Sequence, residues 1–159
     1  MFRKILPVMA ASLIALNAGA AMAQNTTITI GDQLEPPHLD PTSAAAGAID
    51  NVVYANIYEG LTRFAADGSV IAGLAESWDI SEDGLGYTFH LHSGVKFHDG
   101  SDMNAADVVF SLNRARAEDS TNAQKGLFAA IANVEALDDM TVQVTLSQPT
   151  GAFLFNMAW

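Results

Sequence analysis

The histidine side chains of this chain are the groups best suited to acid–base or metal chemistry near neutral pH. His90 and His92 stand two residues apart in an alternating stretch, so they would share one strand face and could supply two ligands to a metal ion. No third ligand stands at a diagnostic spacing, so we interpret this face as solvated and expect no metal site. His98-Asp99-Gly100 could place an acid beside a base, but Asp-Gly favours a tight turn and neighbouring strand residues point apart.

His38 lies in a proline-rich stretch that the sequence predicts to be extended. Residues 36–41 read PPHLDP, and each proline fixes its own φ and disfavours helix in the residue before it. Two interpretations of His38 remain open: a solvated loop residue, or a residue that contacts a ligand. His38 is therefore kept as a candidate ligand-binding residue.

The sequence contains none of the short motifs typical of catalytic or nucleotide-binding sites. There is no nucleophile elbow, HExxH, P-loop or GxGxxG. The acidic residues are scattered through predicted turns, with no pattern that separates an acid from a base. We therefore expect a protein that is not an enzyme and that needs no cofactor.

The composition excludes several further classes of protein. The 159 residues include 18 acidic and 7 basic side chains, for a formal net charge of −11, and no cysteine. Because phosphate affinity needs a basic face, no nucleic-acid partner is expected. Without cysteine there is no disulfide scaffold, thiolate zinc site or cysteine nucleophile.

Residues 1–23 have the three parts of a secretory signal peptide. A basic start and an apolar stretch lead to Ala21-Met22-Ala23, whose small residues favour cleavage before Gln24. The apolar stretch is shorter than the about 20 residues that a membrane span needs, and no later segment is long and apolar enough. Because no cysteine follows the cleavage site, we expect a soluble periplasmic protein that is neither a lipoprotein nor inserted in the membrane after cleavage.

The segment that follows this leader predicts one strand and one helix. Thr26–Gly31 alternates threonine with isoleucine, as a short strand would. From Ser43 to about Tyr58 the apolar residues recur at helical spacing, and Gly60 is expected just past the end of that helix.

Short apolar runs then alternate with turn signals as far as Gly100. The expected strands are Leu61–Phe64, Glu76–Ile80 and Tyr87–His92, with a continuation through Val95 and Phe97. The expected turns are Asp67-Gly68, Glu82-Asp83-Gly84 and His98-Asp99-Gly100. We expect the aromatic residues of these strands to pack in the core rather than to contact a ligand; they are Trp78, Tyr87, Phe89 and Phe97.

The remaining chain predicts helices around a second hairpin. Asn104 can cap a helix, with Asp107 as the reciprocal acid of a capping box. A short helix at Gly126–Ala132 and strands at Val134–Leu137 and Thr141–Leu146 follow. The last residues, GAFLFNMAW, predict the start of an apolar helix with no polar terminator, so we interpret the chain as the N-terminal piece of a longer protein.

One ordered set of motifs resembles a known family. Leu74-Ala75-Glu76-Ser77-Trp78, the acidic turn at Glu82–Gly84, Tyr87–Leu91, Gly94–Gly100 and Asp107–Ser111 occur in series, preceded by Leu39-Asp40-Pro41 and Tyr58–Leu61. This series resembles the periplasmic solute-binding proteins of ABC importers known as family 5, which carry oligopeptides, dipeptides, nickel chelates and related solutes. The resemblance covers nearly the whole chain after the leader.

The resemblance implies an α/β, type II periplasmic-binding fold with two lobes that close on a ligand by hinge motion. Only its N-terminal portion would be present here. Residues 24–62 would form the first strand and helix of lobe I, and residues 63–159 the small mixed α+β domain of this family, truncated at its end.

The resemblance also implies a ligand-binding segment directly after Leu39-Asp40-Pro41. Residues 42–48 would be extended and would pair their main chain with a peptide, with Ala45, Ala46, Gly47 and Ala48 facing the solute. No charged side chain lies in this segment, so it cannot itself form a salt bridge with a ligand. His38 would lie near the rim.

The function implied is capture of a peptide or small solute and its delivery to an ABC permease in the inner membrane by a monomeric protein. Two alternatives stay open. One is a carrier of a nickel chelate, an opine or another non-peptide solute. The other is an extracytoplasmic sensor or chaperone module built on the same fold.

Overall fold

The computed structural model describes residues 27–43, 46–54 and 56–159. The chain divides into two compact units, Met1–Gln33 and Leu34–Trp159, and only residues 27–33 of the first are described. The predicted signal peptide, residues 1–23, lies outside the described residues. No helix within the described ranges has both the length and the apolar character needed to cross a membrane.

The strand predicted at Thr26–Gly31 is not formed in its described part. Residues 27–31 carry no regular secondary structure, and the side chains of Ile28 and Ile30 are 83% and 80% exposed. A strand needs a neighbour for its main-chain hydrogen bonds, and no described strand pairs with this segment. The alternation of threonine and isoleucine was therefore not sufficient to predict a strand here.

The predicted helix between Ser43 and Tyr58 forms only as α1, Gly47–Val53. Its apolar stripe is partly confirmed, since Ile49 and Val53 are buried. The helix ends early because Tyr54 adopts an extended backbone with ψ of 128°.

Gly60 lies well beyond the end of α1, so its predicted role as the helix terminator is wrong. A Cβ at this position would lie 2.5 Å from the main-chain oxygen of Met157. Gly60 is thus needed for a close approach between two chain segments that are far apart in sequence.

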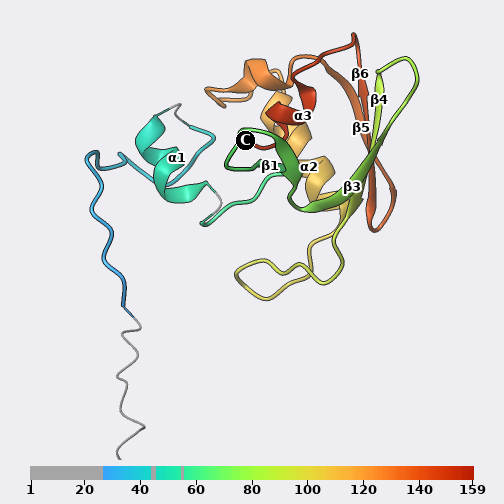
Figure 1. The fold of residues 1–159 in the computed structure, drawn as a ribbon. Helices are drawn as coiled ribbons and strands as arrows, with labels where there is room; N and C mark the ends of the chain where they lie inside the picture. Colours follow the sequence, from blue (N-terminus) through green and yellow to red (C-terminus); the bar gives the residue numbers. More distant parts are fainter. Residues whose placement is uncertain (1–26, 44–45, 55) are drawn as a thin grey trace, which may run out of the picture. The chain divides into compact units, whose positions relative to one another are not determined.

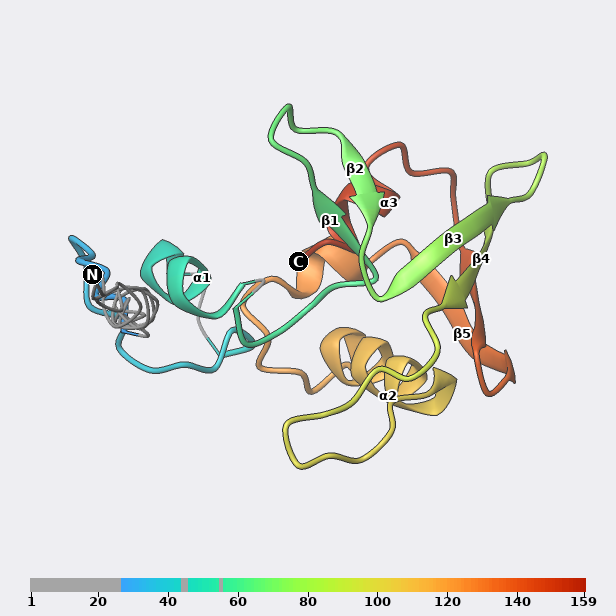
Figure 2. The same ribbon diagram turned by 60° about the horizontal axis from the view of Figure 1, so that its bottom comes forward.

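The larger sheet has four antiparallel strands in the order β3-β4-β6-β5 (Figure 1). Its strands are β3 Ala75–Ile80, β4 Gly86–Leu91, β5 Ile131–Asp138 and β6 Thr141–Leu146. A separate hairpin, β1 Thr62–Phe64 and β2 Val70–Ala72, turns at Gly68, whose φ is +82° (Figure 2). The predicted hairpins and their turns are confirmed.

The core lies between one face of the four-stranded sheet and α2, Ala105–Arg116. Tyr87, Phe89 and Leu91 of β4 are buried, as their alternation predicted, and so are the alternate residues of β6. α2 begins with the predicted capping box: the Asn104 side chain accepts from the Ala106 N–H at 2.8 Å, and Asp107 accepts from the Asn104 N–H at 2.9 Å.

Three local predictions differ from the structure. Val95 and Phe97 do not continue the sheet, because the Phe97 main chain closes the turn to Ser101, and the Phe97 side chain is 44% exposed rather than in the core. The helix predicted at Gly126–Ala132 is only a 3-10 turn, η1 Lys125–Phe128, because β5 begins at Ile131. The helix predicted at the end of the chain, by contrast, is confirmed as α3, Phe153–Asn156. It is a single turn that places the buried Phe153 ring against Tyr87, with ring centroids 4.5 Å apart.

Candidate functional site

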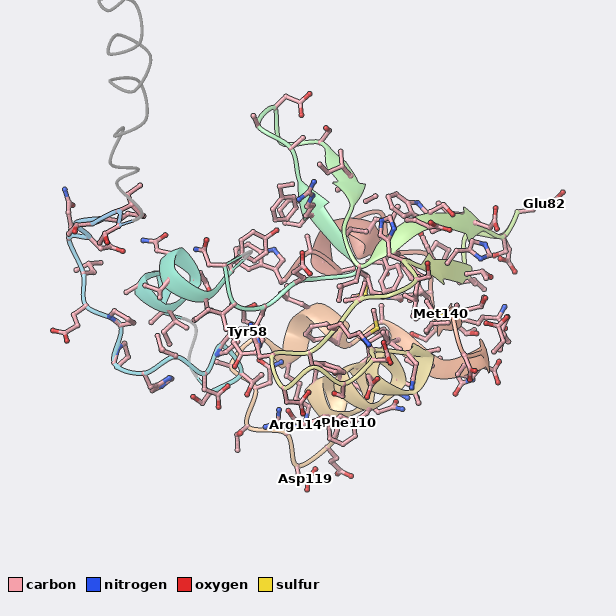
Figure 3. The ribbon with its side chains drawn as sticks, turned by 90° about the horizontal axis from the view of Figure 1, so that it is seen from below. Tyr58, Glu82, Phe110, Arg114, Asp119 and Met140 are labelled. Atoms are coloured by element: carbon pink, nitrogen blue, oxygen red, sulfur yellow. The ribbon has the colours of Figure 1, made fainter. Side chains whose placement is uncertain are left out.

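A groove of about 560 Å³ brings the proline-rich loop together with α1 and the C-terminal half of α2. The loop that follows α2 closes another side, and Trp159 also lines the groove. Figure 3 shows Phe110 and Arg114 projecting from α2 near Asp119 of that loop, with Tyr58 on the same side of the molecule. A groove of this size falls within the range of small-ligand sites.

The loop that enters the groove is organised by the Asp40 carboxylate. Its Oδ1 accepts hydrogen bonds from the Thr42 hydroxyl at 2.7 Å and from the Thr42 main-chain N–H at 2.8 Å. These bonds hold the pKa of Asp40 below its ordinary value of 3.8, and the nearby charges of Arg114 and His38 lower the pKa further. Asp40 is therefore ionised across the neutral range and fixes the turn.

The groove is lined by more negative than positive charge. Its carboxylates belong to Asp40, Asp50, Glu59 and Asp119, and the single basic side chain on its lining is Arg114. The formal sum is 1 − 4 = −3 among the described lining residues. Such a site repels simple anions but can hold a cationic group.

Two aromatic residues of the groove lining, Tyr54 and Trp159, belong to a cluster of rings. The ring centroid of Tyr54 lies 5.9 Å from that of Trp159 and 6.3 Å from that of Phe64, and the centroids of Phe64 and Phe155 lie 4.4 Å apart. Phe64 and Phe155 do not line the groove themselves. The Tyr54 hydroxyl is buried and has no hydrogen-bond partner among the described residues. A buried hydroxyl without a partner is costly to the fold.

The structure brings only part of the predicted ligand segment to this site. Thr42 lines the groove, whereas Ala45 lies outside the described residues. Ala46 is extended and precedes α1, but its main-chain oxygen already accepts from the Ile49 N–H at 2.8 Å. Gly47 is exposed and Ala48 is 7% exposed in the first turn of α1, so these two residues are helical and not extended as expected.

His38 supports the loop from outside the groove lining. Its Nδ1 accepts from the Asp40 main-chain N–H at 3.3 Å, and its Nε2 lies 3.2 Å from the Ser43 hydroxyl. The His38 side chain is therefore exposed but makes contacts within its own loop, with Asp40 and Ser43.

The two strand histidines each have an acidic partner across the sheet. His90 Nε2 lies 2.9 Å from Asp79 Oδ2, and His92 Nδ1 lies 3.6 Å from Glu76 Oε2. Within the described ranges no group of three or more His, Cys, Asp or Glu side chains could hold a metal ion. Both histidines lie on the partly exposed face of the sheet, opposite Phe89 and its buried neighbours.

A second groove of about 510 Å³ shares Tyr58, Glu59 and Trp159 with the first. It is lined by Phe97 and His98, and its single basic residue on the described lining, Lys96, pairs with Asp102. The exposed ring of Phe97 thus has a role in shaping this groove instead of the core.

Sequence reasoning missed two side chains of α2 that line the first groove. Arg114 and Phe110 lie on α2 but outside its buried stripe, and such residues are ordinarily solvated. A signal in the sequence was the apolar Phe110 outside the buried stripe of α2. Its ring is 67% exposed in the structure and lines the groove.

The class of the protein follows from a family model that matches more than half of the chain. The family described as bacterial extracellular solute-binding proteins, family 5 Middle, has a model that matches residues 69–158. The chain belongs to this family, whose members are solute-binding proteins.

Individual relatives agree with this assignment. The chain is 42% identical over 153 residues to a glutathione-binding protein, GsiB, of Pectobacterium atrosepticum, covering 92% of this chain and 29% of that protein. Campylobacter jejuni NikZ in complex with Ni(L-His) superposes with a TM-score of 0.70 and 33% identity, over 79% of this chain and 25% of that one. Helicobacter pylori DppA, an ABC transporter-associated periplasmic binding protein in complex with the peptide STSA, gives a TM-score of 0.66 and 33% identity, over 76% and 27%.

The chain thus spans less than a third of the length of these relatives. The fold is a portion of the α/β periplasmic-binding architecture, as the sequence motifs implied.

Proposed function

We propose that the full-length protein is the substrate-binding component of an ABC importer that captures a peptide, with glutathione and short peptides as the leading ligands. It delivers this ligand to a permease in the inner membrane, and it acts as a monomer by binding and lobe closure without catalysis. The observation that carries this proposal is the 42% identity to a glutathione-binding protein across 92% of the chain. The peptide-bound relative supports the same ligand class.

We further propose the layout of the protein. Residues 1–23 are a cleaved signal peptide, residues 24–62 belong to lobe I, and residues 63–159 form the small mixed α+β domain. The protein works in the periplasm and is not a lipoprotein. In this layout the groove beside Asp40 and Thr42 belongs to one side of the ligand cleft.

We also propose that Ala45, Ala46, Gly47 and Ala48 take part in ligand binding, in different ways. Ala45 and Ala46 precede α1, and Ala46 has the extended backbone that pairing with a peptide requires. Gly47 offers an exposed backbone at the start of α1, while Ala48 contributes by packing because its side chain is buried. His38 holds the preceding turn through its contacts with Asp40 and Ser43.

A carrier of a metal chelate is the second candidate, because the nickel-bound NikZ superposes as well as the peptide-bound relative does. The charge of the groove favours the peptide. Chelates that present several carboxylates would face the acids of the groove lining, whereas a peptide brings an ammonium group.

The test is to identify the solute that the full-length product of the gene retains. The protein is purified from periplasm without denaturation, and native mass spectrometry gives the mass of the bound solute. We expect glutathione or short peptides. A nickel chelate or opine in its place would favour the second candidate, and a protein that is ligand-free and shows no thermal shift with peptides, glutathione or chelates would contradict a carrier function.

A further inference from the structure

Three turns of the chain contain the dipeptide Asp-Gly, whose peptide bond is especially prone to rearrangement. They are Asp67-Gly68, Asp83-Gly84 and Asp99-Gly100, and the three aspartates are exposed to water. In this reaction the glycine nitrogen attacks the side-chain carboxyl carbon of the aspartate, and the carboxyl OH leaves with the N–H hydrogen as water. Glycine favours the attack because it has no Cβ to hinder it.

The cyclic succinimide that results is opened by a water molecule at one of its two carbonyls. Opening at the former main-chain carbonyl gives isoaspartate, in which the main chain runs through the side-chain carboxyl group. No atom is gained or lost overall, but the main chain of the turn becomes one methylene longer. Because the length of a turn fixes the register of its hairpin, isoaspartate in these turns would disturb strand pairing.

The nitrogen that would make the attack is hydrogen-bonded in each of the three turns. The N–H groups of Gly68, Gly84 and Gly100 donate, in that order, to the main-chain oxygens of Ala65, Ser81 and Phe97, each at 2.9 Å. The nitrogen must give up this bond before it can approach the carboxyl carbon, so the turn opposes the first step.

The carboxylate is also held, by a serine hydroxyl and a main-chain N–H. Asp99 Oδ1 accepts from the Ser101 hydroxyl at 2.7 Å and from the Ser101 N–H at 2.9 Å. Asp67 Oδ1 accepts the same two bonds from Ser69, at 2.7 Å and 3.0 Å. These bonds tie the carboxylate to the residue beyond the glycine.

The third turn reaches the same arrangement with a serine on the other side. Asp83 Oδ1 accepts from the Ser81 hydroxyl at 2.6 Å and from the Leu85 N–H at 3.0 Å. In all three turns the hydrogen bonds lower the pKa of the aspartate. An ionised carboxylate has no OH to lose as water, so it resists the attack.

We propose that Asp67, Asp83 and Asp99 are latent sites of isoaspartate formation, and that each folded turn holds its site unreactive through the bonded glycine N–H and the serine hydroxyl on the carboxylate. This inference does not depend on the identity of the ligand. If the serines served only the stability of the whole fold, loss of one would instead expose all three sites together.

The experiment incubates the full-length protein for weeks at neutral pH in water labelled with a heavy oxygen isotope, because opening of a succinimide introduces one solvent oxygen. Peptide mapping by mass spectrometry assigns the label and the isoaspartate to each turn. The parent is compared in its folded state and in concentrated urea. The folded variants are Ser101→Ala, Ser101→Thr and, as a control exposed on α2 outside the three turns, Ser111→Ala.

We expect isoaspartate to form about tenfold or more slowly at each site in the folded parent than in urea, since two hydrogen bonds must be lost. Ser101→Ala should accelerate the reaction about two- to tenfold at Asp99 alone. Ser101→Thr keeps the hydroxyl, so this variant and Ser111→Ala should react like the parent.

Equal rates in the folded and unfolded parent would overturn the proposal. So would a Ser101→Ala protein that reacts like the parent at Asp99, or one that is accelerated equally at all three turns. Should Ser101→Ala fail to fold in a thermal denaturation, Ser69→Ala decides, because Ser69 makes the same two contacts in another turn. Acceleration at Asp67 alone is then expected, and an unchanged rate there would contradict the role of the hydroxyl.

Discussion

Five aspartates in the described part of the chain use the same local device, in which the carboxylate accepts a hydrogen bond from the main-chain N–H two residues later. They are Asp40, Asp67, Asp83, Asp99 and Asp138. Hydrogen bonds from side chain and main chain hold the pKa of each below 3.8. The many acidic residues of the sequence thus include a set that fixes turns, and Asp40 fixes the turn beside the groove.

The lowered pKa values set the direction of a pH dependence. A carboxyl whose pKa is lower in the folded state contributes stability that is fully present above its unfolded value of 3.8 and is lost as the pH falls through the folded value. We expect Asp99→Asn to be less stable than the parent at pH 7, and the difference to shrink as the pH falls below 3.8 through the lower folded value. Thermal denaturation at pH 7 and at a series of acidic pH values checks this.

The matched control for Asp99→Asn is Glu82→Gln. It removes one negative charge from another turn, and Glu82 projects away from the molecule at the tip of that turn (Figure 3). This variant should match the parent at every pH of the series. A destabilisation of Asp99→Asn that did not shrink as the pH fell below 3.8 would contradict the role of the ionised carboxylate.

Gly60 gives a second prediction at the scale of a single residue. An alanine Cβ there would approach main-chain atoms of Met157 and Thr62 to 2.5 Å and 2.9 Å, which the backbone can relieve only by moving. We expect Gly60→Ala to lower the free energy of unfolding by about 1–3 kcal/mol, as overpacking does. Gly126→Ala is the control, because no atom lies within 4 Å of the added Cβ. Urea denaturation measures both, and equal stabilities would contradict the close approach.

At the scale of elements, α2 is the link between the core and the groove. Its buried face, which includes Val108 and Leu112, packs on the sheet. Phe110 and Arg114 on its outer face line the groove. The capping box at Asn104 and Asp107 fixes where the helix begins. Because a helix has a fixed number of residues per turn, the position where α2 begins determines which of its later residues point outward.

We expect Asn104→Ala to destabilise the protein by about 1 kcal/mol, because the side chain satisfies an N–H group that the helix leaves free. The free energy of unfolding in urea is the measurement. Ser111→Ala on the exposed face of α2 is the control and should change it by less than about 0.5 kcal/mol. An Asn104→Ala protein as stable as this control would contradict the cap.

The elements that the sequence predicted well are those whose signals are local. The alternation of residues in Tyr87–Leu91 and the neighbouring Asp-Gly turns predict strands. These strands pair with other strands of the described sheet. The strand at Thr26–Gly31 and the extension through Phe97 failed because pairing depends on a neighbour that no local pattern reveals. For the site, the motif Leu39-Asp40-Pro41 located the loop, but Arg114 and Tyr54 could not be predicted, since tertiary packing alone brings them there.

At the scale of the whole molecule, the chain belongs to the family 5 solute-binding proteins, and the groove beside Asp40 has a net negative lining. The proposed signal peptide predicts that the secreted protein begins at Gln24. Intact-mass measurement of the protein from the periplasm checks this cleavage. A protein that keeps residues 1–23, or that is found attached to membranes, would contradict both the cleavage and the proposed location.

The central claim is that the full-length protein binds glutathione or a short peptide and is not a carrier of metal chelates. The most direct measurement is calorimetric titration of that protein, freed of retained solute, with glutathione, a dipeptide, a tripeptide and Ni(L-His). The account predicts saturable one-to-one binding of glutathione or a short peptide, with no measurable heat from the nickel chelate. Saturable binding of the chelate with none of the peptides would contradict it.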